Sequence, residues 1–113
     1  LSGDLRHICE QSGVGAEIDA AALPLSRAGR VYAEATKTDP IQLALCGGED
    51  YELLFTVPAR KRAALDRFRR HAGCRLTPIG VIRPTRYGIT LKTVRGNVIP
   101  LRNTSYRHFA PNR

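Results

Sequence analysis

The stretch from Leu43 to Pro58 constrains the fold of this sequence more than any other. Asp39-Pro40, just before it, predicts the start of a short helix, because aspartate caps free N–H groups and proline fits the first helical position. Gly47-Gly48 predicts the end of that helix, since glycine adopts the left-handed conformation that a helix C-terminus needs. Residues 51–57 then predict a strand covered on both sides, with Leu54 on one face and, on the other, Tyr51, Leu53, Phe55 and Val57.

Two carboxylates, Glu49 and Asp50, lie on the predicted turn between that helix and that strand. A glycine pair that leads into a helix often cradles phosphate, but these glycines follow a helix, so the nearby end of the helix dipole is negative. We therefore expect the turn to repel phosphate and to attract a cation, an amine or a metal ion. The alternative is a solvated turn whose carboxylates bond their own backbone.

The rest of the chain alternates between helical and strand patterns. Helices are predicted over 2–12, from Pro24-Leu25-Ser26 through Glu34, and over 59–72; strands are predicted over 14–19, 75–83, 87–94 and 98–101, with a hairpin turn at Arg95-Gly96-Asn97. Ser2 and Gly13 are expected to cap and stop the first helix, and Gly73 to stop the last. Apolar stripes should face the core at Leu25, Ala28, Val31, Tyr32 and Ala35, and at Ala64, Leu65, Phe68 and Ala72. This order predicts an α/β or α+β fold, one sheet with helices packed on it.

Length and composition narrow the class of protein. A chain of 113 residues fits one domain, and no apolar run approaches the roughly 20 residues of a membrane span. The three cysteines, Cys9, Cys46 and Cys74, are far apart and odd in number, which fits neither a disulfide framework nor a zinc pattern. They indicate small, buried or half-buried residues in a reducing cytoplasm.

The net charge of +8 comes almost entirely from arginine and invites a nucleic-acid interpretation. The predicted helix 59–72 carries much of it, at Arg60, Lys61, Arg62, Arg67, Arg69 and Arg70. The alternative, a solvated outer face, is the commoner arrangement, and no aromatic residues are interleaved on which bases could stack. We expect this helix to face solvent and not to read a specific DNA sequence.

Several of these segments together resemble the thiamine-monophosphate kinase family. The specific match is Leu43 to Pro58, with its core at residues 47–55. Weaker matches agree in order and spacing: Asp4-Leu5-Arg6-His7-Ile8, residues 12–19, Leu23-Pro24-Leu25-Ser26, Ile79-Gly80-Val81-Ile82, and Tyr106-Arg107-His108-Phe109. The resemblance covers nearly the whole chain. It implies the C-terminal domain fold of the aminoimidazole-ribonucleotide-synthetase-like superfamily, a mixed sheet flanked by helices.

The resemblance also implies a function. Members of this family transfer the γ-phosphoryl group of ATP to thiamine monophosphate, using magnesium, and form thiamine diphosphate. In the family, an N-terminal domain supplies most metal ligands, and an Asp-x-Ser-Asp-Gly-Leu segment lies at the start of the C-terminal domain. Leu1 resembles the final leucine of that segment. Residues 1–113 would then be a single domain, most of the C-terminal domain of a larger two-domain cytoplasmic kinase. We expect it to hold no metal, ATP or catalytic residue by itself, and to contact substrate through Glu49, Tyr106 and Asp50.

The sequence departs from the family pattern near its end, where Arg107 reverses the charge of a usual aspartate, and at Cys46, where a small hydroxyl residue is common. Three hypotheses follow: the substrate side of this kinase, another enzyme of the superfamily with a different phosphate acceptor, or a basic nucleic-acid-binding domain. The third predicts DNA binding that falls steeply with salt. For the first, the expected partners are thiamine monophosphate, ATP and the N-terminal domain, with no membrane and no specific nucleic acid.

Overall fold

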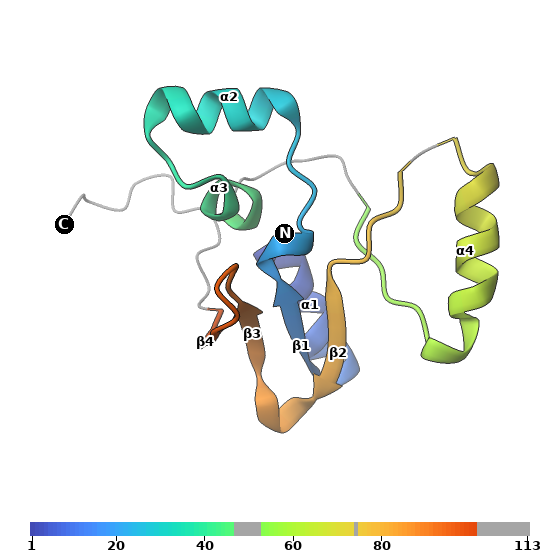
Figure 1. The fold of residues 1–113 in the computed structure, drawn as a ribbon. Coiled ribbons are helices and arrows are strands. Elements are labelled where there is room, and N and C mark those ends of the chain that lie inside the picture. The colour runs from blue at the N-terminus through green and yellow to red at the C-terminus, as the bar shows by residue number, and fades with distance from the viewer. Residues whose placement is uncertain (47–52, 74, 102–113) are drawn as a thin grey trace.

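A computed structural model describes residues 1–46, 53–73 and 75–101 (Figure 1). The helices are α1 (Ser2–Ser12), α2 (Arg27–Thr36), α3 (Pro40–Cys46) and α4 (Arg62–His71). Short 3₁₀ turns are η1 (Ala20–Ala22), η2 (Ala59–Lys61) and η3 (Thr85–Tyr87). The strands are β1 (Val14–Asp19), β2 (Gly80–Pro84), β3 (Ile89–Lys92) and β4 (Val98–Pro100).

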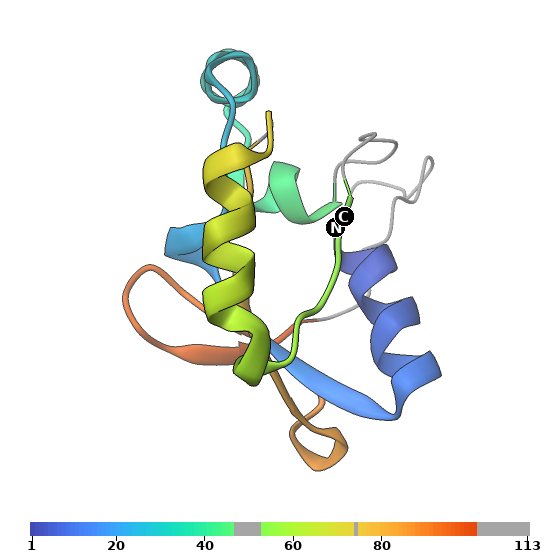
Figure 2. The ribbon, with the colours of Figure 1, turned by 90° about the vertical axis from the view of Figure 1, so that its right-hand side faces the viewer.

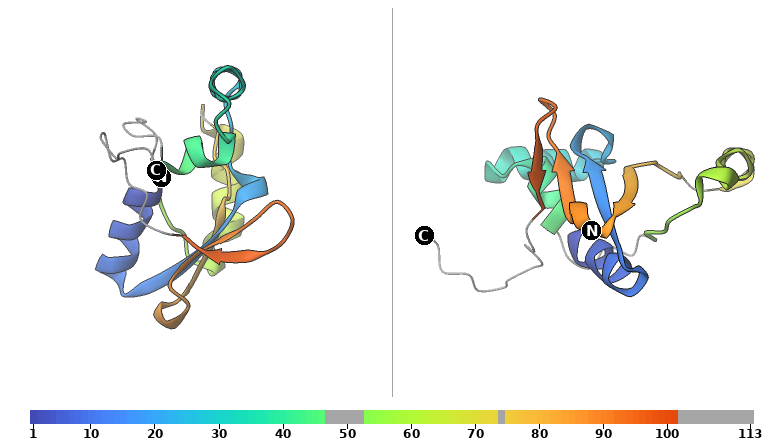
Figure 3. Two further views of the ribbon diagram at one scale, coloured as in Figure 1. Left: turned by 90° about the vertical axis from the view of Figure 1, so that its left-hand side faces the viewer. Right: turned by 90° about the horizontal axis from the view of Figure 1, so that it is seen from below.

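The four strands form one mixed sheet in the order β2-β1-β3-β4. β1 pairs antiparallel with β2 and parallel with β3, and β3 pairs antiparallel with β4. Seen from below, α1 lies on one side of the sheet, and α4 stands beyond the edge of the sheet that β2 forms (Figure 3). The predicted fold class, a mixed sheet with helices, is therefore confirmed.

The core lies between α1, α3 and one face of the sheet. β1 alternates so that Ala16 and Ile18 point into this core, joined by the buried Leu5 of α1, Leu45 of α3 and Leu91 of β3. The spacing of Leu5, Ile8 and Cys9 on α1 and the period of two on β1 both predict this packing, so local pattern and tertiary contact agree for α1 and β1.

Local signals placed several element ends correctly. Gly13 ends α1 in the left-handed conformation, with φ 64°. Asp39 caps α3, since the Ile41 N–H donates to its carboxylate at 2.9 Å, and Ser26 caps α2 by accepting from the Gly29 N–H at 2.9 Å. Gly96, with φ 94°, closes the β3–β4 hairpin through its N–H bond to the Thr93 carbonyl. The Ser2 cap is wrong: Leu1 is the N-cap residue, and Ser2 is already inside the helix and buried.

Three strand predictions need correction. Residues 53–57 form no strand, and the Leu53 side chain is 85% exposed; residues 51 and 52 lie outside the described residues. The strand predicted over 75–83 begins only at Gly80, and Tyr87 belongs to η3 rather than to β3. Alternation predicts a surface that could pair and pack, but a strand forms only where a neighbouring strand accepts its hydrogen bonds.

The predicted inner faces of two helices are also wrong. On α2, Val31 and Tyr32 are 60% and 58% exposed, and Ala33 is the buried residue. None of the residues of α4, all of them described, is buried, and Phe68 is 59% exposed. Ala72, the residue after α4, is extended and caps the helix, so Gly73 does not act as the expected left-handed stop. Within the described chain, α4 stands apart from α1, α2 and α3, beyond β2 (Figures 1 and 2).

Candidate functional site

The residues predicted to bind substrate, Glu49, Asp50 and Tyr106, lie outside the described residues, as do Gly47-Gly48 and the tail from residue 102 onward. The structure does describe the residues that flank them. Those flanks are the end of α3, Leu53 and Leu54, and Leu101 after β4.

The flanks on both sides of the predicted site are held in the same core. Leu45, at 1% exposed, is the most deeply buried large side chain of the described residues and anchors the end of α3. Leu54 and Leu101 pack against the same cluster. Tyr106 follows Leu101 by five residues, a length that spans at most about 17 Å when extended. The sequence segments that carry Glu49 and Tyr106 therefore both depart from one small region of the protein.

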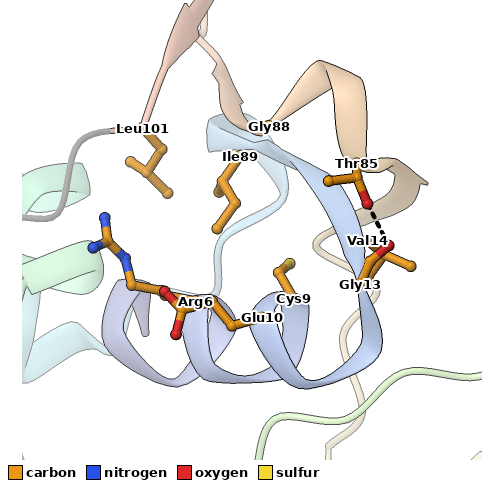
Figure 4. Close-up of a pocket in the computed structure, with 9 residues that line it drawn as sticks. All are labelled: Arg6, Cys9, Glu10, Gly13, Val14, Thr85, Gly88, Ile89 and Leu101. Carbon is orange, nitrogen blue, oxygen red and sulfur yellow. Dashed lines mark hydrogen bonds between the residues drawn. The ribbon is translucent and has the colours of Figure 1, made fainter.

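A shallow pocket of about 370 Å³ lies beside this region, between α1 and the start of β3 (Figure 4). Apolar groups form most of its wall, and Arg6 and Glu10, one helical turn apart, stand on its α1 side. Thr85 donates a hydrogen bond to the Gly13 carbonyl and ties η3 to the end of α1. The lining residues are Arg6, Cys9, Glu10, Gly13, Val14, Thr85, Gly88, Ile89 and Leu101.

Cys9 is the thiol that lines this pocket, and its side chain is buried. Burial raises the pKa of the Cys9 thiol above its ordinary value, because desolvation disfavours the thiolate. The thiolate, not the thiol, is the nucleophile and the metal ligand, so Cys9 is suited to packing rather than to covalent catalysis at neutral pH. The pocket can offer apolar contact and the charges of Arg6 and Glu10, which are means of binding.

Sequence reasoning did not identify this pocket. Its wall combines residues of α1 with residues between Thr85 and Leu101, and the parallel pairing of β1 with β3 brings them together. The Gly88 carbonyl accepts a hydrogen bond from the Ala16 N–H at 3.0 Å, and Gly88 has φ 64°, which glycine favours. A glycine at position 88 was the available signal, and it does not by itself specify a pocket.

Charged groups elsewhere form no comparable site within residues 1–46, 53–73 and 75–101. No three histidine, cysteine or acidic side chains in these ranges come close enough to hold a metal ion. Two ion pairs, Glu17 with Arg83 at 3.8 Å and Asp66 with Arg69 at 3.6 Å, lie on the surface, where such pairs contribute about 0–1 kcal/mol. The basic side chains of η2 and α4 are exposed, as expected for a solvated face. No helix in the described ranges is long and apolar enough to cross a membrane.

Comparison with known proteins establishes the relationship. Thiamine-monophosphate kinase of Escherichia coli (strain K12) is 41% identical over 111 residues, which cover 97% of this chain and 33% of that protein. The chain is homologous to thiamine-monophosphate kinase. The kinase of Buchnera aphidicola subsp. Schizaphis graminum (strain Sg) is 30% identical over 96% of the chain, and that of Aquifex aeolicus (strain VF5) is 46% identical over 54% of it. No family model matches.

The homology extends over nearly all of this chain but over only part of each relative. The chain spans about a third of the length of the thiamine-monophosphate kinases that it matches from end to end. One domain with one sheet and one core agrees with a match of that size. The activity of the complete relatives is therefore only proposed for this chain.

Proposed function

We propose that this chain is the substrate-side part of a thiamine-monophosphate kinase, most of the C-terminal domain of a two-domain enzyme. The observation that carries the proposal is the 41% identity to the Escherichia coli kinase across 97% of the chain. The segment Gly47 to Phe55, the most specific resemblance to the family, lies within the matched length. In this proposal the complete enzyme, a cytoplasmic protein, phosphorylates thiamine monophosphate with ATP and so serves thiamine diphosphate biosynthesis.

The chemistry of thiamine suits the residues assigned to it. Its thiazolium ring is a planar cation, which the face of an aromatic ring such as Tyr106 can attract. Its aminopyrimidine carries an amine, which a carboxylate such as Glu49 can hold by a charge-assisted hydrogen bond. Asp50 lies next to Glu49 and would add to the negative potential. Leu45 is buried in the core cluster, and the partly buried Leu54 and Leu101 pack against it. This supports the assignment, because the chain on both sides of residues 47–52 and before residue 102 is anchored in the same core.

Magnesium and ATP belong to the complete enzyme in this proposal. Magnesium prefers carboxylates together with phosphate oxygens and water. Within the described residues the donor set does not fit such an ion, since no cluster of three suitable side chains forms there. No step is therefore assigned to a metal held by these residues. The 113-residue chain alone should show no kinase activity, and turnover of thiamine monophosphate by the purified chain with ATP and magnesium would contradict this.

A chimeric enzyme tests the substrate assignment. The Escherichia coli kinase would carry this chain in place of its matching third, and Glu49→Gln would be compared with Glu52→Gln, which makes the same change in charge three residues later. A hydrogen bond to a charged group contributes about 1.5–3 kcal/mol, so Glu49→Gln should weaken thiamine-monophosphate binding roughly ten- to a hundredfold. The KM for ATP should stay unchanged, and Glu52→Gln should resemble the parent.

The same experiment separates the alternatives. An unchanged KM and kcat for thiamine monophosphate in Glu49→Gln would favour the solvated-turn interpretation. A changed dependence of the rate on ATP or magnesium concentration would instead assign Glu49 to the binding of magnesium or ATP. An inactive parent chimera would be followed by binding measurements with thiamine monophosphate, because substrate affinity does not require turnover.

A further inference from the structure

The pocket between α1 and the start of β3 carries an exposed carboxylate on an otherwise apolar wall. Ile89 and Leu101 belong to that wall, and their side chains point toward α1 (Figure 4). Glu10 stands on the α1 side and forms no ion pair with any residue of the ranges that the structure describes. Arg6 precedes Glu10 by one helical turn, so the two charges occupy different positions along the pocket. The pocket therefore offers apolar contact together with a place for one cation beside Glu10.

Residues 102–113, which lie outside the described residues and which we call the C-terminal segment, begin at this pocket. Leu101 directly precedes the segment and lines the pocket. The segment contains three arginines and no acidic residue. At 1.5 Å per residue, α1 runs about 11 Å from Arg6 to Gly13, whereas the chain from Leu101 to Arg107 can span about 20 Å when extended. The segment is therefore long enough to reach every part of the pocket.

The order of side chains in the C-terminal segment matches the two features of the pocket. Residues 102–105 are polar, so its first aromatic side chains are Tyr106 and Phe109. Successive side chains of an extended chain point in opposite directions, so Arg107 and Phe109 share one side and Tyr106 faces the other. Phe109 has no polar atom to leave unpaired on an apolar wall, whereas the hydroxyl of a buried tyrosine needs a partner. The orientation that places Phe109 on the wall therefore also turns Arg107 toward Glu10.

We propose that the C-terminal segment docks in this pocket, with Phe109 on the apolar wall and Arg107 paired with Glu10. Burial of the Phe109 ring supplies most of the affinity, since an exposed ion pair contributes little. The ion pair sets the register: Glu10 attracts Arg107 and Arg6 repels it, so the two charges on α1 define where the arginine lies. Tyr106 then faces away from α1, and its ring is free to contact substrate. This last consequence rests on the proposed function, whereas the docking does not.

A pair of tryptophan reporters tests the docking in the 113-residue chain, which contains no tryptophan. Phe109→Trp places the reporter in the C-terminal segment, and Tyr32→Trp places the control on α2, at a position that is 58% exposed. Acrylamide quenching should be several-fold weaker for Phe109→Trp than for Tyr32→Trp, and dilution of the protein should not change the ratio. Equal quenching in the two variants would overturn the proposal. Protection that disappears on dilution would show that a second copy covers the reporter and would also overturn it.

A charge exchange then tests the pairing of Arg107 with Glu10. In the Phe109→Trp background, Glu10→Lys should shift the ratio of docked to free segment by about 1.5- to 5-fold toward the free form, the range open to a surface ion pair. Glu34→Lys makes the same change at an exposed position of α2 and should leave the quenching unchanged. Adding Arg107→Glu to Glu10→Lys should restore the protection, a recovery that general loosening of the fold does not produce.

The outcomes that contradict the pairing are equally specific. Protection that survives Glu10→Lys would place the C-terminal segment on another surface, and a double variant without recovery would separate Arg107 from Glu10. Either result would overturn the proposal. No thiamine monophosphate is present in these measurements, so their outcome is independent of the proposed function.

Discussion

The segment α1–β1 and the segment from Leu53 to α4 carry sequence patterns of similar strength, yet only the first is built into the core. α1 and β1 have the predicted bounds, and Leu5, Ala16 and Ile18 are buried as their periodicity indicates. Leu53 is 85% exposed and Phe68 is 59% exposed, although alternation and helical spacing mark both as inward-facing. Periodicity therefore predicts which side of a helix or strand is apolar. Whether that side is buried depends on another element packing against it, and the periodicity does not identify that element.

The largest expected effect is on stability and comes from comparing alanine substitutions at Leu45 and Leu53, two leucines that flank the same predicted turn. Leu45→Ala should destabilise the protein by about 2–5 kcal/mol, since it opens a cavity in the core. Leu53→Ala should stay within about 0.5 kcal/mol, because an exposed side chain loses no packing. Urea unfolding followed by circular dichroism measures both. Equal losses at the two positions would mean that the segment after residue 52 is packed in solution, and the contrast between the two regions would fail.

The bounds of α1 and β1 could be predicted from the sequence, whereas α2 begins and ends two to three residues later than predicted. Gly13, Ser26 and Asp39 end or begin their helices through their own backbone or side-chain chemistry. The positions of β2 and of the pocket wall could not be predicted, since both depend on pairing between β1 and residues some 65–75 positions later. Of the candidate site, sequence patterns and family resemblance supply Glu49, Asp50 and Tyr106, and these stay predictions because they lie outside the described residues.

A smaller effect on stability is expected from alanine substitutions at two glycines, Gly80 on β2 and Gly73 after α4. A Cβ atom at Gly80 would collide with the backbone carbonyl of Glu17 across the β1–β2 pair. Gly80→Ala should therefore cost about 1–3 kcal/mol, as overpacking does, by pushing the two strands apart. A Cβ atom at Gly73 meets nothing within 4 Å. Gly73→Ala should be neutral or stabilise by about 0.4–1 kcal/mol, since alanine restricts the unfolded chain.

Thermal unfolding of these two variants sharpens the comparison between the regions. A large loss in Gly73→Ala would show that the end of α4 is closely packed. A neutral Gly80→Ala would show that β2 does not pair with β1 in the observed register. Either outcome would reverse the assignment of the packed and the uncovered region.

The smallest expected effect is a pH dependence that arises in the packed region, at Cys9 on α1. Burial raises the pKa of the Cys9 thiol in the folded protein, whereas in the unfolded chain the thiol ionises near its ordinary pKa of about 8.5. Above that pH the unfolded chain binds fewer protons than the folded protein, so the free energy of unfolding falls as the pH rises. Urea unfolding between pH 7 and roughly 9.5 should show a steeper decline for the parent than for Cys9→Ala, in which the other titrating groups are unchanged. Parallel pH profiles would mean that the Cys9 thiol is as solvated in the folded protein as in the unfolded chain, and that α1 is less firmly packed against the sheet than its buried side chains indicate.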